Sequence, residues 1–95
     1  MNAPSGWRWF EIDAPLNEWS TGRSPAEVIS AHEALLHITA MPLDVRPGQP
    51  LPEAAPNNLV RYVDHGDIRV IFLVTHPIIA DGLRLIRVTP RPGTH

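Results

Sequence analysis

Arginine and histidine are the side chains of this sequence that are best suited to chemistry. The chain has eight basic residues, all of them arginine, together with five histidines and no cysteine. Arginine binds phosphate through a planar, permanently charged group, and histidine exchanges protons near neutral pH. The missing cysteine excludes disulfide bonds, a thiolate zinc site and a cysteine nucleophile within this chain.

The arginines are concentrated in the C-terminal part of the chain. Residues 59–95 carry five arginines against three acidic residues, a balance of +2, whereas residues 1–58 carry three arginines against seven acidic residues, a balance of −4. A locally basic surface on an acidic protein attracts phosphate groups. Two interpretations remain open: these arginines contact nucleic acid, or they decorate a solvated face of a sheet.

A pair of histidines resembles a zinc-protease motif but does not have its spacing. In residues 32–37 (HEALLH) the two histidines lie five positions apart, which separates them by about 140° around a helix. They therefore do not share one metal ion, and we predict no metal site and no cofactor. We expect His32 on the apolar face of its helix and His37 on the polar face, within reach of Glu33.

The N-terminal half is expected to form one strand and two helices. Residues 7–12 predict a strand. Asp13 is expected to cap a short helix that runs through Trp19, and Gly22 ends it. A second helix follows from residue 24 to about residue 40: Ser24 is its cap, Pro25 occupies its first position, and Glu27 completes a capping box. The face that packs on the sheet is expected to hold Val28, Ile29, Ala31, Leu35, Leu36 and Ile38.

The C-terminal half is expected to form a sheet. Five prolines in residues 42–56 predict an extended connection that is neither helix nor central strand. Strands are expected at residues 59–63, 68–75 and 83–89, with a turn at residues 64–67 around Gly66. The nearly continuous apolar run of residues 68–75 predicts a central strand that pairs antiparallel with both neighbours. Buried residues are expected to include Val70, Phe72 and Val74, and the three tryptophans are expected in the core.

These elements predict a single α+β domain over residues 1–95. Its order is an N-terminal strand, a helical hairpin and a three-stranded antiparallel meander, β-α-α-β-β-β. Residues 1–10 lack the apolar centre of a signal peptide, and no apolar run approaches the roughly 20 residues that span a bilayer. We therefore expect a cytoplasmic protein with no membrane partner.

Four segments resemble the RelE/ParE toxin superfamily, and they occur in the same order. Residues 65–72 (HGDIRVIF) resemble its "GDYRVIY" stretch, in which a hairpin glycine and acid precede a strand whose arginine points into the site. Residues 10–19 (FEIDAPLNEW) resemble the first strand and helix start of the family. Residues 24–42 resemble its second helix, and residues 83–91 (LRLIRVTPR) resemble its last strand and basic terminus.

The resemblance implies the toxin of a bacterial type II toxin–antitoxin pair, neutralised by a cognate antitoxin protein. RelE-like members are mRNA interferases, endoribonucleases that cut mRNA on the ribosome and inhibit translation. ParE-like members share the fold but inhibit DNA gyrase and do not cut RNA. For a nuclease, the match implies that Arg69 contacts the scissile phosphate and that Arg91 stabilises transition-state charge while the ribose 2′-hydroxyl attacks.

Three further residues complete the predicted site. RelE-like members carry lysines on the strand before the hairpin, where this chain has Arg61. Arg61 and Arg87 are assigned to RNA phosphate, although arginine does not serve as a base. Some relatives use a C-terminal histidine as general acid–base, which gives that role to His95.

Several alternatives stay open. The chain is a RelE-like endoribonuclease, a ParE-like toxin without enzymatic activity, or a non-toxic domain of the same fold. Antiparallel pairing of the last two strands is expected to bring Arg69 and Arg91 together around an anion. The alternative is that Arg69 pairs with Asp64 or Asp67 while Arg91 stays in solvent.

Overall fold

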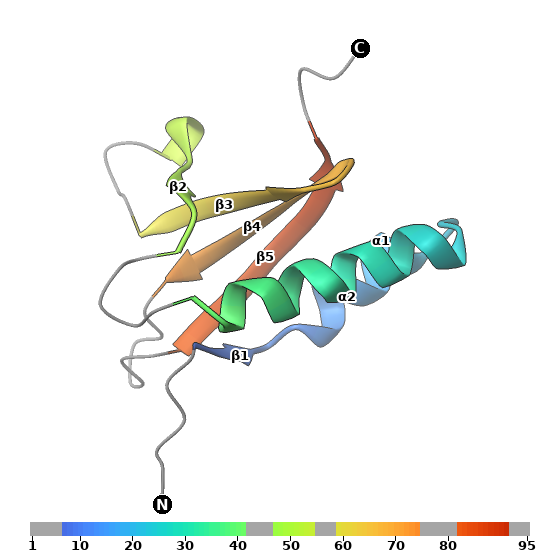
Figure 1. The fold of residues 1–95 in the computed structure, drawn as a ribbon, viewed down its shortest axis with the longest axis horizontal. Coiled ribbons are helices and arrows are strands. Elements are labelled where there is room, and N and C mark those ends of the chain that lie inside the picture. The colour runs from blue at the N-terminus through green and yellow to red at the C-terminus, as the bar shows by residue number, and fades with distance from the viewer. Residues whose placement is uncertain (1–6, 42–46, 55–58, 75–81, 92–95) are drawn as a thin grey trace, which may run out of the picture.

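A mixed sheet and two α-helices make up the part of the chain that the structure describes (Figure 1). In the computed structural model these are residues 7–41, 47–54, 59–74 and 82–91. The helices are α1 (Asp13–Ser20) and α2 (Pro25–Thr39). The strands are β1 (Arg8–Phe10), β2 (Gln49–Pro50), β3 (Val60–His65), β4 (Ile68–Val74) and β5 (Gly82–Pro90), and a 3-10 turn, η1, covers Pro52–Ala54. The predicted α+β class is confirmed.

The strand order is β1-β5-β4-β3-β2. Strand β4 pairs antiparallel with both β3 and β5, as the apolar run predicted, and Thr75 lies outside the described residues. The prediction of a wholly antiparallel sheet is wrong at one edge, because β1 runs parallel to β5, with Trp9 opposite Leu83. A strand so short carries no local signal for the direction of a partner more than 70 residues away.

The proline-rich connection contributes two elements that the sequence did not predict. Strand β2 pairs antiparallel with β3 at the sheet edge, with Pro50 opposite Arg61. Proline has no N–H to donate, so an edge position is the one that accepts it. The 3-10 turn η1 follows directly, and the predicted element order therefore matches only in part.

The beginning of α2 agrees with the predicted capping box. The Ser24 hydroxyl accepts a hydrogen bond from the Glu27 backbone N–H at 3.2 Å, and Glu27 Oε1 accepts one from the Ser24 N–H at 3.1 Å. The predicted cap of α1 is wrong: Ile12 holds the cap position, without a side-chain hydrogen bond, and Asp13 is the first helical residue. There its carboxylate still lies favourably at the positive end of the helix.

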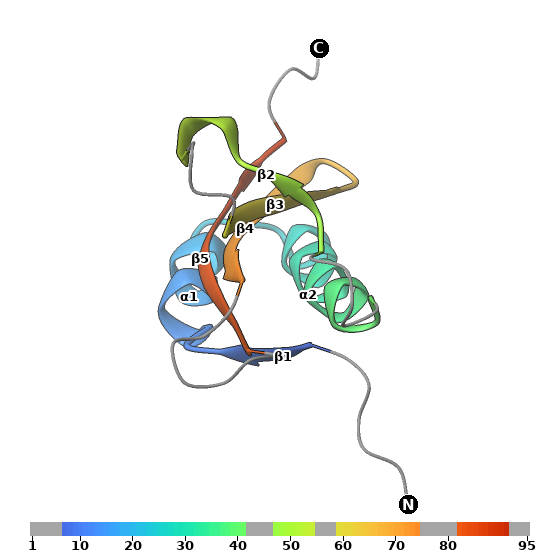
Figure 2. The same cartoon turned by 90° about the vertical axis from the view of Figure 1, so that its left-hand side faces the viewer.

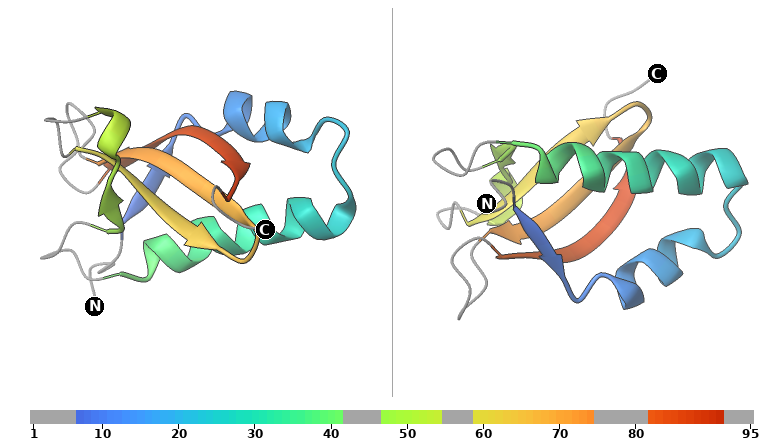
Figure 3. Two further views of the ribbon diagram at one scale, coloured as in Figure 1. Left: turned by 90° about the horizontal axis from the view of Figure 1, so that it is seen from above. Right: turned by 60° about the horizontal axis from the view of Figure 1, so that its bottom comes forward.

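Both helices contribute to one apolar core on a single face of the sheet (Figure 3). Helix α1 packs on β5, and α2 packs on β3 and β4. The core side chains of the central strand are Ile68, Val70, Phe72 and Val74, every second residue, as a pleated strand requires. Trp7 and Trp19 are buried, and the Trp9 Nε1 donates a hydrogen bond to the Leu35 carbonyl at 2.9 Å.

The buried face of α2 is narrower than predicted. Leu35 and Ile38 are buried as expected, Val28 is half-buried, and Ile29 and Leu36 are 57% and 69% exposed. The alanines at 31 and 34 form the rest of the buried stripe. Because alanine is small, it lets the helix lie close to the sheet, and the larger residues at the margins remain in solvent.

The histidines of α2 also lie differently from the prediction. His32 is exposed rather than packed on the apolar face. Glu33, expected within reach of His37, has its Oε1 3.9 Å from Nε2 of His65 on β3. Within the described residues no three histidine, aspartate or glutamate side chains are arranged to hold a metal ion, and no helix is long and apolar enough to cross a membrane.

On the other face of the sheet the described residues place no α-helix, and the β2–η1 segment partly covers this face (Figure 2). Leu51 and Ile71 are buried although they lie outside the main core. Alternation along β3 and β4, together with the strand register, places Tyr62, Asp64 and Arg69 on this face. We call it the helix-free face.

Candidate functional site

Strand pairing brings Arg69 and Arg91 to the same end of the helix-free face. Arg69 is the second residue of β4 and lies opposite Thr89, two positions before Arg91. The Arg91 backbone N–H donates a hydrogen bond to the Asp67 carbonyl at 2.8 Å, which ties the end of β5 to the β3–β4 turn. The two arginines expected to converge are therefore neighbours in space.

The anion between the two guanidinium groups is the carboxylate of Asp64. Arg69 donates to it with both arms of its guanidinium, Nε to Oδ1 at 2.7 Å and Nη2 to Oδ2 at 3.1 Å. Nε of Arg91 lies 3.5 Å from Oδ2 of the same carboxylate. The ring of Tyr62 stacks against Arg69, with 3.8 Å between the guanidinium carbon and the ring centroid. The alternative pairing of Arg69 with Asp64 is the observed one, while Arg91 joins the pair instead of lying alone in solvent.

Within the cluster of Arg69, Asp64 and Arg91, the ion pair favours the charged forms of Asp64 and Arg69. Hydrogen bonding from Arg69 lowers the pKa of Asp64 below its usual range, against the opposing effect of burial, and the charges of both arginines lower it further. The same hydrogen bond raises the pKa of Arg69. One carboxylate between two guanidinium groups gives the cluster a formal net charge of about +1. Arg91 presents most of that charge to solvent: its side chain is 49% exposed, against 16% for Arg69.

Arg61 does not join this cluster. Arg61 precedes Asp64 by three positions on β3, so the two side chains project from opposite faces of the sheet. Its guanidinium donates from Nε to the Pro47 carbonyl and from Nη2 to the Gly48 carbonyl, both at 2.8 Å. The structure therefore gives Arg61 a role in holding residues 47–48 against β3.

Arg87 lies on the same face as the cluster. It is opposite Ile71 in the register of β4 and β5, and Ile71 follows Arg69 by two residues. The side chain is exposed and forms no ion pair with another described residue. It lines a cavity of about 270 Å³ together with Glu18, Trp19 and Arg23. Arg87 is thus available to a phosphate group.

The remaining predicted site residue, His95, lies outside the described residues. Its role as general acid–base stays a prediction. Tyr62 was missed as a site residue, although it precedes Asp64 by two positions on a strand and therefore shares its face.

The pair of Arg69 and Arg91 can bind an anion with several oxygens, because guanidinium groups bind phosphate oxygens in pairs. The charges of two acidic side chains, Asp64 and Glu18, compete locally with such a ligand. Comparisons with protein-family models, with curated proteins and with solved structures found no match to this chain.

Proposed function

We propose that this chain is the toxin of a type II toxin–antitoxin pair and a RelE-like, ribosome-dependent mRNA endonuclease that inhibits translation. One observation carries the proposal: Arg69 and Arg91 meet at one end of the helix-free face. The superfamily resemblance assigns Arg69 to the scissile phosphate and Arg91 to the transition-state charge. Two guanidinium groups held close together repel each other unless an anion lies between them. In the free chain that anion is Asp64, and an RNA phosphate is the anion expected to compete with it.

In this mechanism Arg91 makes the primary contact with phosphate. Its guanidinium is half exposed, whereas both arms of Arg69 are engaged by Asp64. Arg69 adds a fixed positive charge behind the contact. The ribose 2′-oxygen attacks the adjacent phosphorus, and the bond from phosphorus to the 5′-oxygen of the next nucleotide breaks. Negative charge builds on the phosphate oxygens during this step, and charges already in position stabilise that state without reorganisation. The 2′-hydroxyl proton passes to a general base and the departing 5′-oxygen takes up a proton from a general acid; His95 is the residue predicted for this acid–base role.

The bidentate bond between Asp64 and Arg69 favours a second candidate, a ParE-like toxin that inhibits DNA gyrase. A guanidinium whose two arms are used inside the protein is suited to shape a rigid basic surface rather than to grip a phosphate. Such a surface recognises a protein target without chemistry. In both candidates the partners include a cognate antitoxin protein. For the first they also include the ribosome and mRNA.

The test is expression of the chain in bacteria, followed by mapping of mRNA ends in a translating extract. The wild type is expected to arrest growth and to produce breaks within codons. Arg91→Ala is expected to reduce cleavage about 100-fold, the effect of removing one donor that stabilises an oxyanion. The matched control is Arg84→Ala, an exposed arginine near the other end of β5 that pairs with Glu11 at 2.8 Å.

Each other outcome assigns a different function. Intact mRNA together with inhibited DNA supercoiling overturns the nuclease and supports the ParE-like candidate. Undisturbed growth overturns both and leaves a non-toxic domain of this fold. Equal activity of Arg91→Ala and Arg84→Ala shows that the arginine cluster is not the site of cleavage.

A further inference from the structure

Helix α2 carries two large apolar side chains on its solvent side. Ile29 is 57% exposed and Leu36 is 69% exposed. They lie seven positions apart, which is about 700° of helix rotation, so the two side chains fall almost on one line along the helix. His32 and Glu33, both exposed, lie between them. We call these four residues the outer stripe of α2.

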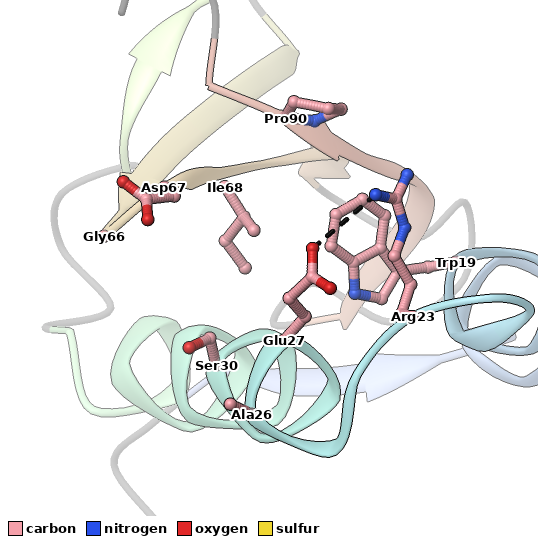
Figure 4. A pocket seen from close by; sticks show the side chains of 9 residues that line it. All are labelled: Trp19, Arg23, Ala26, Glu27, Ser30, Gly66, Asp67, Ile68 and Pro90. Carbon is pink, nitrogen blue, oxygen red and sulfur yellow. Dashed lines mark ion pairs between the residues drawn. The ribbon is translucent and has the colours of Figure 1, made fainter.

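The outer stripe is separate from the side of α2 that faces the β3–β4 turn. Glu27 and Ser30 line the cavity of about 390 Å³ on that side (Figure 4), and both lie at least about 100° around the helix from Ile29. Nη1 of Arg23 lies 3.6 Å from Oε2 of Glu27, the ion pair drawn in the figure. Glu27 therefore has a charged partner in its own chain and takes no part in the outer stripe.

An apolar groove runs along one side of the outer stripe. It is a cavity of about 230 Å³ between α1 and α2, bordered by the exposed side chain of Leu36. Its lining residues come from β1, the start of α1 and α2: Trp9, Ile12, Leu16, His32, Leu35 and Leu36. Because His32 and Leu36 belong to both, the groove and the outer stripe form one continuous surface. Apolar surface of this kind gains free energy when a partner removes it from water.

The order of residues in the outer stripe is complementary to itself. Consider two copies of α2 that lie antiparallel about a two-fold axis passing between His32 and Glu33. The residue three positions before His32 then faces the residue three positions after Glu33, so Ile29 faces Leu36 of the second copy. His32 faces Glu33 of the second copy, and the symmetry repeats both contacts. A parallel pair would instead set Glu33 against Glu33, and like charges in contact are unfavourable.

The pair at the axis has the chemistry to fix this arrangement. The imidazole N–H of His32 donates to a carboxylate in its neutral form, and a protonated ring is attracted more strongly. Within the chain, Oε1 of Glu33 lies 3.9 Å from Nε2 of His65, which is beyond hydrogen-bond distance. The carboxylate of Glu33 therefore retains the capacity to accept a hydrogen bond from a second copy.

We propose that the outer stripe of α2 binds the outer stripe of a second copy of this chain, as an antiparallel helix pair about a two-fold axis. Ile29 of each copy lies beside Leu36 of the other, at the border of its groove. A different protein does not require a stripe that is complementary to itself, so this pattern favours a second copy as the partner. Because α2 packs on the other face of the sheet from Arg69 and Arg91, the dimer leaves both arginine clusters open.

The expected dimer is weak. Helix α2 has 15 residues, so it is roughly 22 Å long and about 10–12 Å wide. A contact along one such helix covers less than the about 800 Å² per partner of a standard interface. We therefore expect a dissociation constant on the order of 100 μM. At the low concentrations of a denaturation experiment the chain is then mostly monomeric.

Sedimentation equilibrium of the free chain, between about 10 μM and 1 mM, tests the proposal. The apparent mass of the wild type is expected to rise from that of a monomer toward that of a dimer. Leu36→Glu sets a charge against an apolar side chain and is expected to weaken association at least about tenfold. Leu36 is exposed in the monomer, so this variant is expected to fold, which circular dichroism checks. The matched control is Ile86→Glu on β5, which replaces another exposed apolar residue and is expected to associate like the wild type.

Two charge variants test the register of the pair. Glu33→Lys sets a cation against His32 of the second copy, and His32→Glu sets a carboxylate against Glu33. Each variant alone is expected to associate at least about tenfold more weakly than the wild type. An equimolar mixture is expected to restore association, because the introduced lysine then faces the introduced glutamate. The unchanged His32 and Glu33 face each other at the same time.

The samples contain no RNA, so the result does not depend on whether the chain cuts mRNA. A wild type that stays monomeric at about 1 mM overturns the proposal. So does association of Leu36→Glu that equals that of the wild type, because the contact then lies elsewhere. A mixture of the two charge variants that associates no more tightly than its components overturns the antiparallel pairing of His32 with Glu33.

Discussion

The two faces of β4 carry residues of different kinds. Ile68, Val70, Phe72 and Val74 point toward the helices and are at most 3% exposed. The residues between them include Arg69 and Ile71, which point to the helix-free face. Because side chains of a strand alternate with a period of two, one strand places its apolar and its charged residues on different sides. Stability and recognition can therefore be altered separately.

The helix-free face is nevertheless not a simple solvated surface. Ile71 of β4 and Leu51 of the β2–η1 segment are buried, and Arg69 is held by Asp64 and Tyr62. A guanidinium fixed at both its arms and its flat side loses little further freedom when a ligand arrives. The face toward α1 and α2, the helix-covered face, thus buries apolar area, whereas the helix-free face fixes charge.

The largest effect is expected from the helix-covered face. Leu35→Ala removes a buried side chain from the contact of α2 with the sheet and is expected to lower the free energy of unfolding by about 2–5 kcal/mol. A domain of this size has about 5–15 kcal/mol in total, so the loss is severe. Urea denaturation measures it.

Leu36→Ala is the matched control, because Leu36 is the next residue of the same helix and is 69% exposed. Its effect is expected to stay within about 0.5 kcal/mol. Similar losses for the two variants would show that the helix face is placed wrongly.

An intermediate effect is expected from the helix-free face. Asp64→Asn removes the negative charge between Arg69 and Arg91 and is expected to lower the free energy of unfolding by about 1–3 kcal/mol. The control is Asp67→Asn, an exposed carboxylate in the turn that follows β3, with little expected effect. Equal stability of wild type and Asp64→Asn would show that the cluster contributes nothing to folding.

The pH dependence sharpens this test. The pKa of Asp64 is lowered in the folded protein, so its contribution is complete above the ordinary aspartate pKa of about 3.9 and is lost as the pH falls through the lower folded value. The difference in unfolding free energy between wild type and Asp64→Asn is therefore expected to be constant near neutral pH and to shrink below about pH 4. A difference that grows on acidification contradicts the lowered pKa.

The helix-covered face was largely predictable from the sequence, because its signals are local. The capping box at Ser24 and the apolar run of β4 each span a few residues and determine their elements directly. What failed was the width of the α2 face. The predicted face included Ala31 together with Ile29 and Leu36 but omitted Ala34, whereas close packing on the sheet buries the two alanines and leaves Ile29 and Leu36 exposed.

The helix-free face was less predictable, because it depends on register. The sequence placed Asp64 in a four-residue turn, but β3 continues to His65 and the turn is confined to Gly66 and Asp67. This shift of two residues is what sets Asp64 opposite Arg69. The β2 edge strand and the parallel pairing of β1 arise from short segments far apart in sequence, and no local pattern encodes them.

The smallest effect is expected at the N-terminus of α2. It separates two sources of stability on the helix-covered face, the helix cap and the buried side chains. Ser24→Ala removes the cap of the Glu27 N–H and is expected to lower the free energy of unfolding by about 1 kcal/mol in urea denaturation. Ser30→Ala, a serine within the same helix, is the control and is expected to change it by less than about 0.5 kcal/mol. Ser24 and Leu35 are three turns apart, so their losses should add in the double variant. If Ser24→Ala and Leu35→Ala lower the free energy of unfolding equally, the cap stabilises α2 as much as its buried face does. Burial is then not the larger source of stability on the helix-covered face.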